Sequence, residues 1–262
     1  MQSQDKNFKI GILGGKGLLG SNLVSFLNAN FKTDSITREN YEKKKGTYYW
    51  VLINANGNTK RYWANQNPVD DFLASTVSVY QSIFDFPSNL YIYISSADAY
   101  ENHTNPKYTS ETKKINPANL QPYGLNKYLA ELIVKRYKQN FLILRSSMIL
   151  GKNLKKGPLF DILHNKPLFI TLKSKLQLIT TYAITEIIEI LIKNFRASET
   201  INIGGKDSFS FTKIQKYFDQ GIKILPQAET QVYHMDVKKV RKLYPSLKTS
   251  EEYLQEFIDY YL

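Results

Sequence analysis

Three glycines at three-residue spacing near the N-terminus constrain this chain more than any other feature. Gly14, Gly17 and Gly20 follow the apolar run Phe8–Leu13 and open a helix expected over Leu18–Ala29. A strand that turns sharply into a helix needs glycine at the bend, where the backbone approaches a phosphate, and where the helix packs on the strand. The free N–H groups at the helix N-terminus favour an anion. The pattern predicts a dinucleotide-binding turn; the alternative is a purely structural turn.

Strand-like and helix-like segments alternate after this turn, as in a mostly parallel α/β sheet. We expect strands at Thr33–Thr37, Tyr48–Asn54, Leu90–Ser95 and Phe141–Ser146, and helices at Val69–Phe84 and Tyr123–Gln139. The sequence therefore predicts a Rossmann-like, doubly wound parallel sheet, with residues 1–150 as the dinucleotide-binding domain.

The segments beyond Gly151 are shorter. We expect a strand near Leu176–Thr181, a helix from Thr185 to Asn194 with Thr185 as its N-cap, a strand at Thr200–Ile203, a helix capped by Ser210 and an amphipathic helix at Ser250–Tyr261. Ligands of such folds bind where the carboxyl ends of strands meet loops. Residues 151–262 are therefore expected to form a smaller C-terminal α/β substrate-binding lobe, partly interleaved with the first domain.

Composition limits the classes of function. The 35 Lys and Arg residues exceed the 23 Asp and Glu residues, for a formal charge of +12. This charge would attract anionic ligands, or it is simply a solvated basic surface; the lysines are scattered, so we expect no nucleic-acid partner. The absence of cysteine excludes disulfides and thiolate chemistry. The histidines, at positions 103, 164 and 234, show no ligand spacing, so no metal is expected.

The termini and apolar runs bear on location. The N-terminal stretch MQSQDKNFK lacks the apolar core of a signal peptide, and no apolar run is long enough to span a bilayer. We therefore expect a cytoplasmic protein with no membrane partner.

The end of the second expected strand bears on the choice of cofactor. NAD-binding domains usually carry an acidic residue there, which holds the ribose 2′-OH. Here the sequence TDSITREN offers Thr37 and Arg38, and a guanidinium suits a 2′-phosphate. NADP(H) is therefore favoured over NAD(H), although Asp34 and Glu39 lie close by. We expect further cofactor contacts from Leu18, Leu19, Asn54, Ala55 and Lys127.

A serine, a tyrosine and a lysine form the candidate catalytic set. Tyr123 and Lys127 are four residues apart, so they share one face of the expected helix. The ammonium could stabilise the phenolate and hold the nicotinamide ribose. Ser96, at the end of the preceding strand, could donate to a substrate carbonyl. The same spacing at Tyr41 and Lys45 lies in a polar connection without helical periodicity. The alternative is structural roles for all three residues.

These stretches together resemble the extended short-chain dehydrogenase/reductases, the NAD-dependent epimerase/dehydratase group. The matching segments are ILGGKGLLGSNLV, VLINANG, YISSADAY, PYGLNKYLAE, ILRSSMILG and INIGG, over roughly the first 205 residues. The resemblance implies Tyr123 as general acid–base, Lys127 as its partner and Ser96 as a hydrogen-bond donor to a sugar substrate. RSSMILG is most similar to dTDP-4-dehydrorhamnose reductase-like sugar reductases, whereas many epimerases carry Asn at the place of Met148.

The resemblance implies an NAD(P)-dependent oxidoreductase that reduces a keto group of a nucleotide-linked sugar. The alternatives are an epimerase or dehydratase with tightly bound NAD, and a non-catalytic NADP-binding protein. A homodimer is expected by analogy. We expect Tyr100, Ser147 and Met148 to contact substrate. Lys155 and Lys156 are expected to be solvated, with contact to a substrate diphosphate as the alternative.

Overall fold

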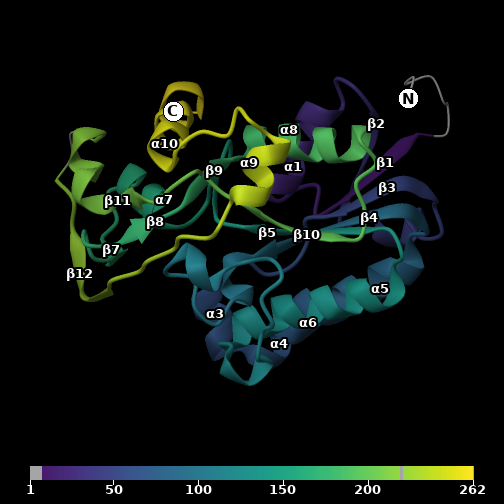
Figure 1. The fold of residues 1–262 in the computed structure, drawn as a ribbon, viewed down its shortest axis with the longest axis horizontal. Helices are drawn as coiled ribbons and strands as arrows, with labels where there is room; N and C mark the ends of the chain where they lie inside the picture. The colour runs from purple at the N-terminus through teal and green to yellow at the C-terminus, as the bar shows by residue number, and fades with distance from the viewer. Residues whose placement is uncertain (1–7, 219–220, 262) are drawn as a thin grey trace.

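The computed structural model describes residues 8–218 and 221–261; most of the N-terminal stretch MQSQDKNFK, in which no signal peptide was expected, lies outside this part. The described residues form a six-stranded parallel sheet in the order β10-β5-β4-β3-β1-β2 (Figure 1). Its strands are β1 (Lys9–Leu13), β2 (Lys32–Ile36), β3 (Tyr49–Asn54), β4 (Ser88–Ser96), β5 (Phe141–Ser146) and β10 (Glu199–Ile203). The strand order reverses beside β1, which confirms the predicted Rossmann-like fold.

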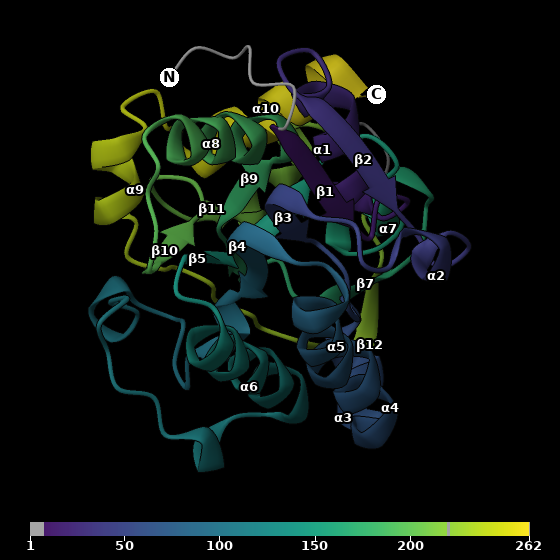
Figure 2. The ribbon, with the colours of Figure 1, turned by 90° about the vertical axis from the view of Figure 1, so that its right-hand side faces the viewer.

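Alternating side chains sort the sheet into two buried faces. In β4, Ile92 and Ile94 point to one face, with α1 (Leu18–Leu27) and α8 (Thr181–Lys193). Tyr91 and Tyr93 point to the other, with α5 (Ser78–Asp85) and α6 (Pro122–Tyr137). Figure 2 shows α1 and α8 above the sheet and α5 and α6 below it. Burial on both faces explains the nearly continuous apolar strands.

The helix expected at Val69–Phe84 is interrupted by a π-helical turn. Residues 73–77 take this form between α4 and α5. Within the turn, the Thr76 hydroxyl donates to the backbone oxygen of Asn126 on α6 over 3.0 Å. The irregular turn therefore ties α4 and α5 to α6. Two short helices precede it and one follows β2: α3 (Arg61–Gln66), α4 (Pro68–Phe72) and α2 (Tyr41–Lys44).

The second half of the chain contributes to two cores. Its small elements are β6 (Met148–Leu150), α7 (Pro158–Leu163), β7 (Leu168–Ile170), β8 (Lys175–Leu176), β9 (Leu178–Thr180), β11 (Phe209–Ser210), β12 (Ile224–Glu229), α9 (Lys238–Leu243) and α10 (Ser250–Tyr261). Most of them surround a second apolar cluster that includes Leu159, Leu168, Phe211 and Phe257. In contrast, β10 and α8 return to the large sheet (Figure 1).

Two expected helix starts were wrong. The helix α8 begins at Thr181, because the Thr180 hydroxyl, not that of Thr185, accepts the N–H of Ala183 at 3.3 Å. The Thr185 hydroxyl instead donates to the backbone within the helix. Ser210 precedes only a 3₁₀ turn, residues 211–216, and makes no capping hydrogen bond.

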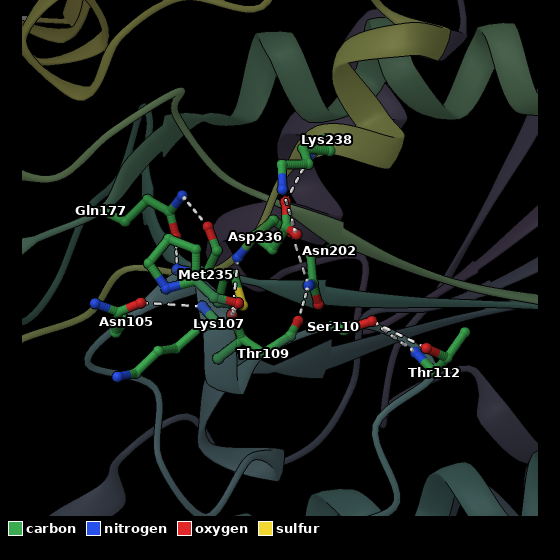
Figure 3. A network of polar contacts seen from close by, with 11 residues as sticks. Asn105, Lys107, Thr109, Ser110, Thr112, Gln177, Asn202, Met235, Asp236 and Lys238 are labelled. Carbon is green, nitrogen blue, oxygen red and sulfur yellow. Dashed lines mark hydrogen bonds and ion pairs between the residues drawn. The ribbon is translucent and has the colours of Figure 1, made fainter.

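A polar network fixes the C-terminal part of the chain to the large sheet. The Asn202 amide on β10 donates to the backbone oxygens of Thr109, at 2.7 Å, and Asp236, at 2.9 Å (Figure 3). The Asp236 N–H donates to the Thr109 hydroxyl over 2.8 Å. Segments more than 100 residues apart are thereby joined, and this places Tyr233, three residues before Asp236, near the end of β4. No helix among the described residues is both long and apolar enough to cross a membrane.

Candidate active site

The glycine turn has the steric demands predicted for it. Gly14 has a φ of +78°, and a Cβ on Gly20 would lie 2.1 Å from the Gly14 carbonyl oxygen. A Cβ on Gly17 would meet only that oxygen, at 3.1 Å. No side chain caps α1, and its first turn, which contains Leu18 and Leu19, holds no acidic residue. The backbone N–H groups at the start of α1 are therefore available to an anion.

The expected cofactor residues next to this turn differ in their surroundings. Arg38 is exposed and lines an open cavity of about 470 Å³ with residues 56–60 and Trp63. Asn54 is buried, and its amide donates to the Tyr91 hydroxyl over 2.8 Å. The carbonyl of Ala55 packs against Gly14. Asn54 thus packs within the protein and Ala55 lies against the glycine turn, while Arg38 lines the cavity.

The structure brings Ser96, Tyr123 and Lys127 together. A Cβ on Gly124 would lie 2.0 Å from the Asp98 carbonyl oxygen, so glycine lets the start of α6 press against the turn after β4. This contact sets Tyr123 beside Ser96. Lys127 is only 4% exposed, and its ammonium lies 6.0 Å from the centre of the Tyr123 ring. The ammonium also lies 3.4 Å from the site of a Cβ on Gly57, in the loop after β3.

Burial controls the protonation of this pair. Desolvation, with the nearby Asp98 carboxylate, raises the pKa of Tyr123 well above its usual value, and the Ser96 hydroxyl opposes the rise. The sequence led us to expect a lowered pKa for Tyr123, but loss of solvent outweighs the opposing charge of Arg61. Desolvation lowers the pKa of Lys127 to about 8, against the opposing effect of the Asp71 and Glu131 carboxylates. At neutral pH the phenol therefore holds its proton and can act as an acid.

Sequence reasoning missed a second group of polar residues around Asp98. The Ser96 hydroxyl donates to one Asp98 oxygen over 3.1 Å, and the Tyr233 hydroxyl donates to the other over 2.8 Å. Arg61 pairs with Asp98 at 3.5 Å and donates to the Tyr233 hydroxyl. His103 stacks on the Tyr233 ring at 4.0 Å. The available signal was Asp98, two residues after Ser96; its partners come from distant segments.

The residues expected to contact substrate differ in their burial and in their contacts. Tyr100 is 2% exposed, and its hydroxyl donates to Asn202 over 2.9 Å, so it packs within the protein. Ser147 is also buried, and no hydrogen bond to its hydroxyl is found among the described residues. The end of the Met148 side chain lies 3.2 Å from the site of a Cβ on Gly157, in the loop that follows β6. Met148 therefore lies against this loop.

One expectation for the lysines of this loop was wrong. Lys155 is exposed, but the ammonium of Lys156 is buried and has no hydrogen-bond partner in the described part of the chain. The loop turns Lys156 inward, toward Lys60 and Lys127, whose charges act on it. Among residues 8–218 and 221–261, no three His, Asp or Glu side chains are grouped as a metal site would require.

Comparison with solved structures confirms the fold. The dTDP-4-dehydrorhamnose reductase of Bacillus anthracis, solved with NADP, has 17% identity and a TM-score of 0.78 over 98% of this chain and 99% of that one. The UDP-glucuronic acid 4-epimerase of Bacillus cereus, solved with UDP-glucuronic acid and NAD, has 16% identity and a TM-score of 0.76 over 97% and 98%. A dTDP-4-dehydrorhamnose reductase from Clostridium acetobutylicum has 16% identity and a TM-score of 0.73 over 96% and 99%.

The sequence comparison identifies the family. No curated protein matches the chain by sequence. The profile of the NAD dependent epimerase/dehydratase family matches residues 10–171, more than half of the chain. This match covers the glycine turn, Ser96, Tyr123 and Lys127, and it confirms the enzyme class that the sequence motifs indicated. The chain belongs to the NAD-dependent epimerase/dehydratase family of extended short-chain dehydrogenase/reductases.

Proposed function

We propose that this protein reduces a keto group of a nucleotide-linked sugar, with hydride supplied by NADPH and a proton supplied by Tyr123. The observation that carries the proposal is the position of Tyr123 beside Ser96 and Lys127. Its hydroxyl is buried beside Ser96, its ring lies 6.0 Å from the Lys127 ammonium, and a phenol whose pKa is not lowered is protonated at neutral pH. A reductase needs such an acid when the carbonyl carbon accepts hydride, because the oxygen then gains negative charge.

The groups around Tyr123 would have separate roles in binding and catalysis. Lys127 is held under the loop after β3 and would hold the nicotinamide ribose. The bound nicotinamide would supply hydride. Ser96 accepts the N–H of Asp98 and donates to its carboxylate, so its position is fixed from two sides. A substrate carbonyl oxygen would compete with Asp98 for the single proton of Ser96.

The preference for NADP(H) rests on Arg38. This residue is exposed at the cavity rim and forms no ion pair among the described residues. Its acidic neighbour Glu39 pairs with Lys16 at 3.0 Å. A free guanidinium there suits a 2′-phosphate, with two parallel hydrogen bonds available.

The experiment is a turnover assay with matched tyrosine variants. Wild-type protein should oxidise NADPH when given a 4-keto-sugar nucleotide. The Tyr123→Phe variant should lose about a hundredfold or more in kcat, the usual contribution of a positioned acid. Tyr48→Phe, at an exposed position just before β3, is the control and should keep the wild-type rate. An unchanged rate in Tyr123→Phe would refute the acid role.

The same preparation distinguishes the epimerase alternative. An epimerase would retain NAD through purification and interconvert sugar nucleotides without consuming NADPH. Dissociable NADPH with net reduction would support the proposal, and tightly held NAD with isomerisation alone would contradict it.

We further propose that the second apolar cluster marks the substrate lobe and that the protein forms a homodimer through α5 and α6. Tyr80, Phe84 and Tyr137 contact one another edge to face and are 40%, 56% and 47% exposed. Leu132 adds to this apolar face. Such a patch favours association. Sedimentation should show a dimer that Phe84→Glu converts to a monomer; a monomeric wild type would contradict this. The cytoplasmic location stays a prediction.

A further inference from the structure

The loop between β6 and α7 reaches from α1 to the neighbourhood of Lys60, which lines the open cavity described above; this cavity is called the crevice below. At one end, the Asn22 amide of α1 donates to the backbone oxygen of Lys152 over 3.1 Å. At the other end, Gly157 has a φ of +93°, a conformation that favours glycine, and it precedes Pro158. Between these points the chain passes from the helix of the glycine turn to the neighbourhood of Lys127. The Asn22 contact therefore holds the start of the loop on the helix of the glycine turn.

Two adjacent lysines in this loop differ in the solvent exposure of their ammonium groups. Lys155 is exposed, whereas the Lys156 ammonium is buried without a hydrogen-bond partner among the described residues. The charges that act on Lys156 are the ammonium groups of Lys60 and Lys127. Burial and these two cations lower the pKa of Lys156 to about 7. Lys60, just before α3, and Lys127, on α6, thus lie close enough to Lys156 for their charges to act on it. No carboxylate among the described residues pairs with Lys156.

This arrangement is unfavourable for the protein alone. A buried cation that lacks a partner loses its hydration without compensation, and neighbouring cations add repulsion. A phosphate group between the ammonium groups would reverse both effects, because it carries negative charge and several acceptor oxygens. We propose that Lys156, with Lys60 and Lys127, forms an anion site in the crevice that binds a phosphate group of a ligand.

Two ligands could bring this phosphate: the dinucleotide pyrophosphate or the diphosphate of a nucleotide-sugar. The inference deepens the proposed function and rests on it for the identity of the ligand. The site itself is tested without turnover. Tyr123→Phe would abolish reduction and leave anion binding intact, so failure of one proposal is distinguishable from failure of the other.

The test measures binding of inorganic pyrophosphate to the full chain by calorimetry. Wild-type protein should bind pyrophosphate, and Lys156→Met should weaken the binding at least tenfold, since one charge-assisted contact is lost. Lys155→Met is the matched control and should bind as wild type does. Without ligand, Lys156→Met should melt at a higher temperature than wild type, because an unpaired buried charge is removed. Equal weakening in the two variants, or no weakening in Lys156→Met, would overturn the proposal.

A second titration distinguishes the two sources of the phosphate. NADP⁺ and UDP are titrated in place of pyrophosphate into wild type and Lys156→Met. Weaker binding of NADP⁺ in the variant assigns the site to the cofactor, and weaker binding of UDP assigns it to the substrate. Unchanged binding of all three ligands in the variant would overturn the site.

Discussion

Replacing Arg145 by methionine should destabilise the protein more than any exposed substitution, because it breaks a buried ion pair. Arg145 on β5 is 2% exposed and Glu131 on α6 is fully buried. Two hydrogen bonds of 2.9 and 2.6 Å join guanidinium and carboxylate, and the Ser95 hydroxyl donates to the same carboxylate over 2.6 Å. The pair fixes the helix that carries Tyr123 to the strand next to Ser96.

The size of the effect follows from what remains after the change. Arg145→Met fills most of the volume but leaves the Glu131 charge buried with a single hydroxyl partner. Removing one member of a buried pair costs about 3–5 kcal/mol. Removing both, as in Glu131→Met with Arg145→Met, leaves no orphaned charge, so the double variant should lie within about 2 kcal/mol of wild type. Its free energy of unfolding should therefore exceed that of Arg145→Met.

Urea unfolding at pH 7, followed by circular dichroism, measures the free energy of unfolding of wild type, the two single variants Arg145→Met and Glu131→Met, and the double variant. Each single loss should be at least about 3 kcal/mol and the double loss at most about 2 kcal/mol. The coupling free energy between the two sites, which is the excess of the summed single losses over the double loss, should therefore be at least about 4 kcal/mol. A loss below about 1 kcal/mol in Arg145→Met, or strictly additive losses, would refute the reasoning. Either result would mean that the carboxylate finds another partner or takes up a proton at little cost.

Three further predictions concern catalysis. Tyr233→Phe removes a donor to the Asp98 carboxylate and should lower kcat/KM by about 10- to 150-fold, the value of a hydrogen bond to a charged group; a wild-type value would show that this contact does not position the site. Arg38→Ala should raise the Kd of NADPH at least about tenfold and leave that of NADH unchanged, as fluorescence titration can measure; equal weakening of both would exclude 2′-phosphate recognition. The rate of reduction should fall as pH rises through about 8, where Lys127 loses its proton while Tyr123 keeps its own; a rate independent of pH from 7 to 9 would contradict this.

The large sheet was predictable because its signals are local. Parallel strands buried on both faces read as apolar runs, and the glycine turn marks the start of the first crossover. The small elements of the second half were harder. β8 and β9 have two and three residues and are separated at Gln177, whose buried amide bonds Gly205 and Met235. Such a break depends on tertiary contacts, so no periodicity in the sequence could indicate it.

In the candidate site, too, the residues set by local spacing were predictable from the sequence and those set by tertiary contacts were not. Ser96, Tyr123 and Lys127 follow a spacing that one helix and one strand impose, so the sequence predicted them together. The group around Asp98 could not be predicted, because Arg61 and Tyr233 are separated by 172 positions and meet only after the C-terminal segment is fixed on β10. The direction of the Tyr123 pKa shift was also missed, since it depends on burial that a spacing does not reveal.

The net charge of +12 conceals where charge is balanced and where it is not. Between β5 and α6, the Arg145 guanidinium forms an ion pair with the Glu131 carboxylate. Between α4 and α6, the buried carboxylate of Asp71 accepts from the Asn126 amide at 2.7 Å. Toward the crevice, Lys127 and Lys156 are buried cations, and Lys156 has no partner in the described residues. Donors fixed in this way need little reorganisation when an anion arrives, which is how an active site stabilises charge that develops during a reaction. The scattered lysines of the surface therefore say little about function, whereas Lys156, buried without a partner in the described residues, indicates the chemistry of the ligand.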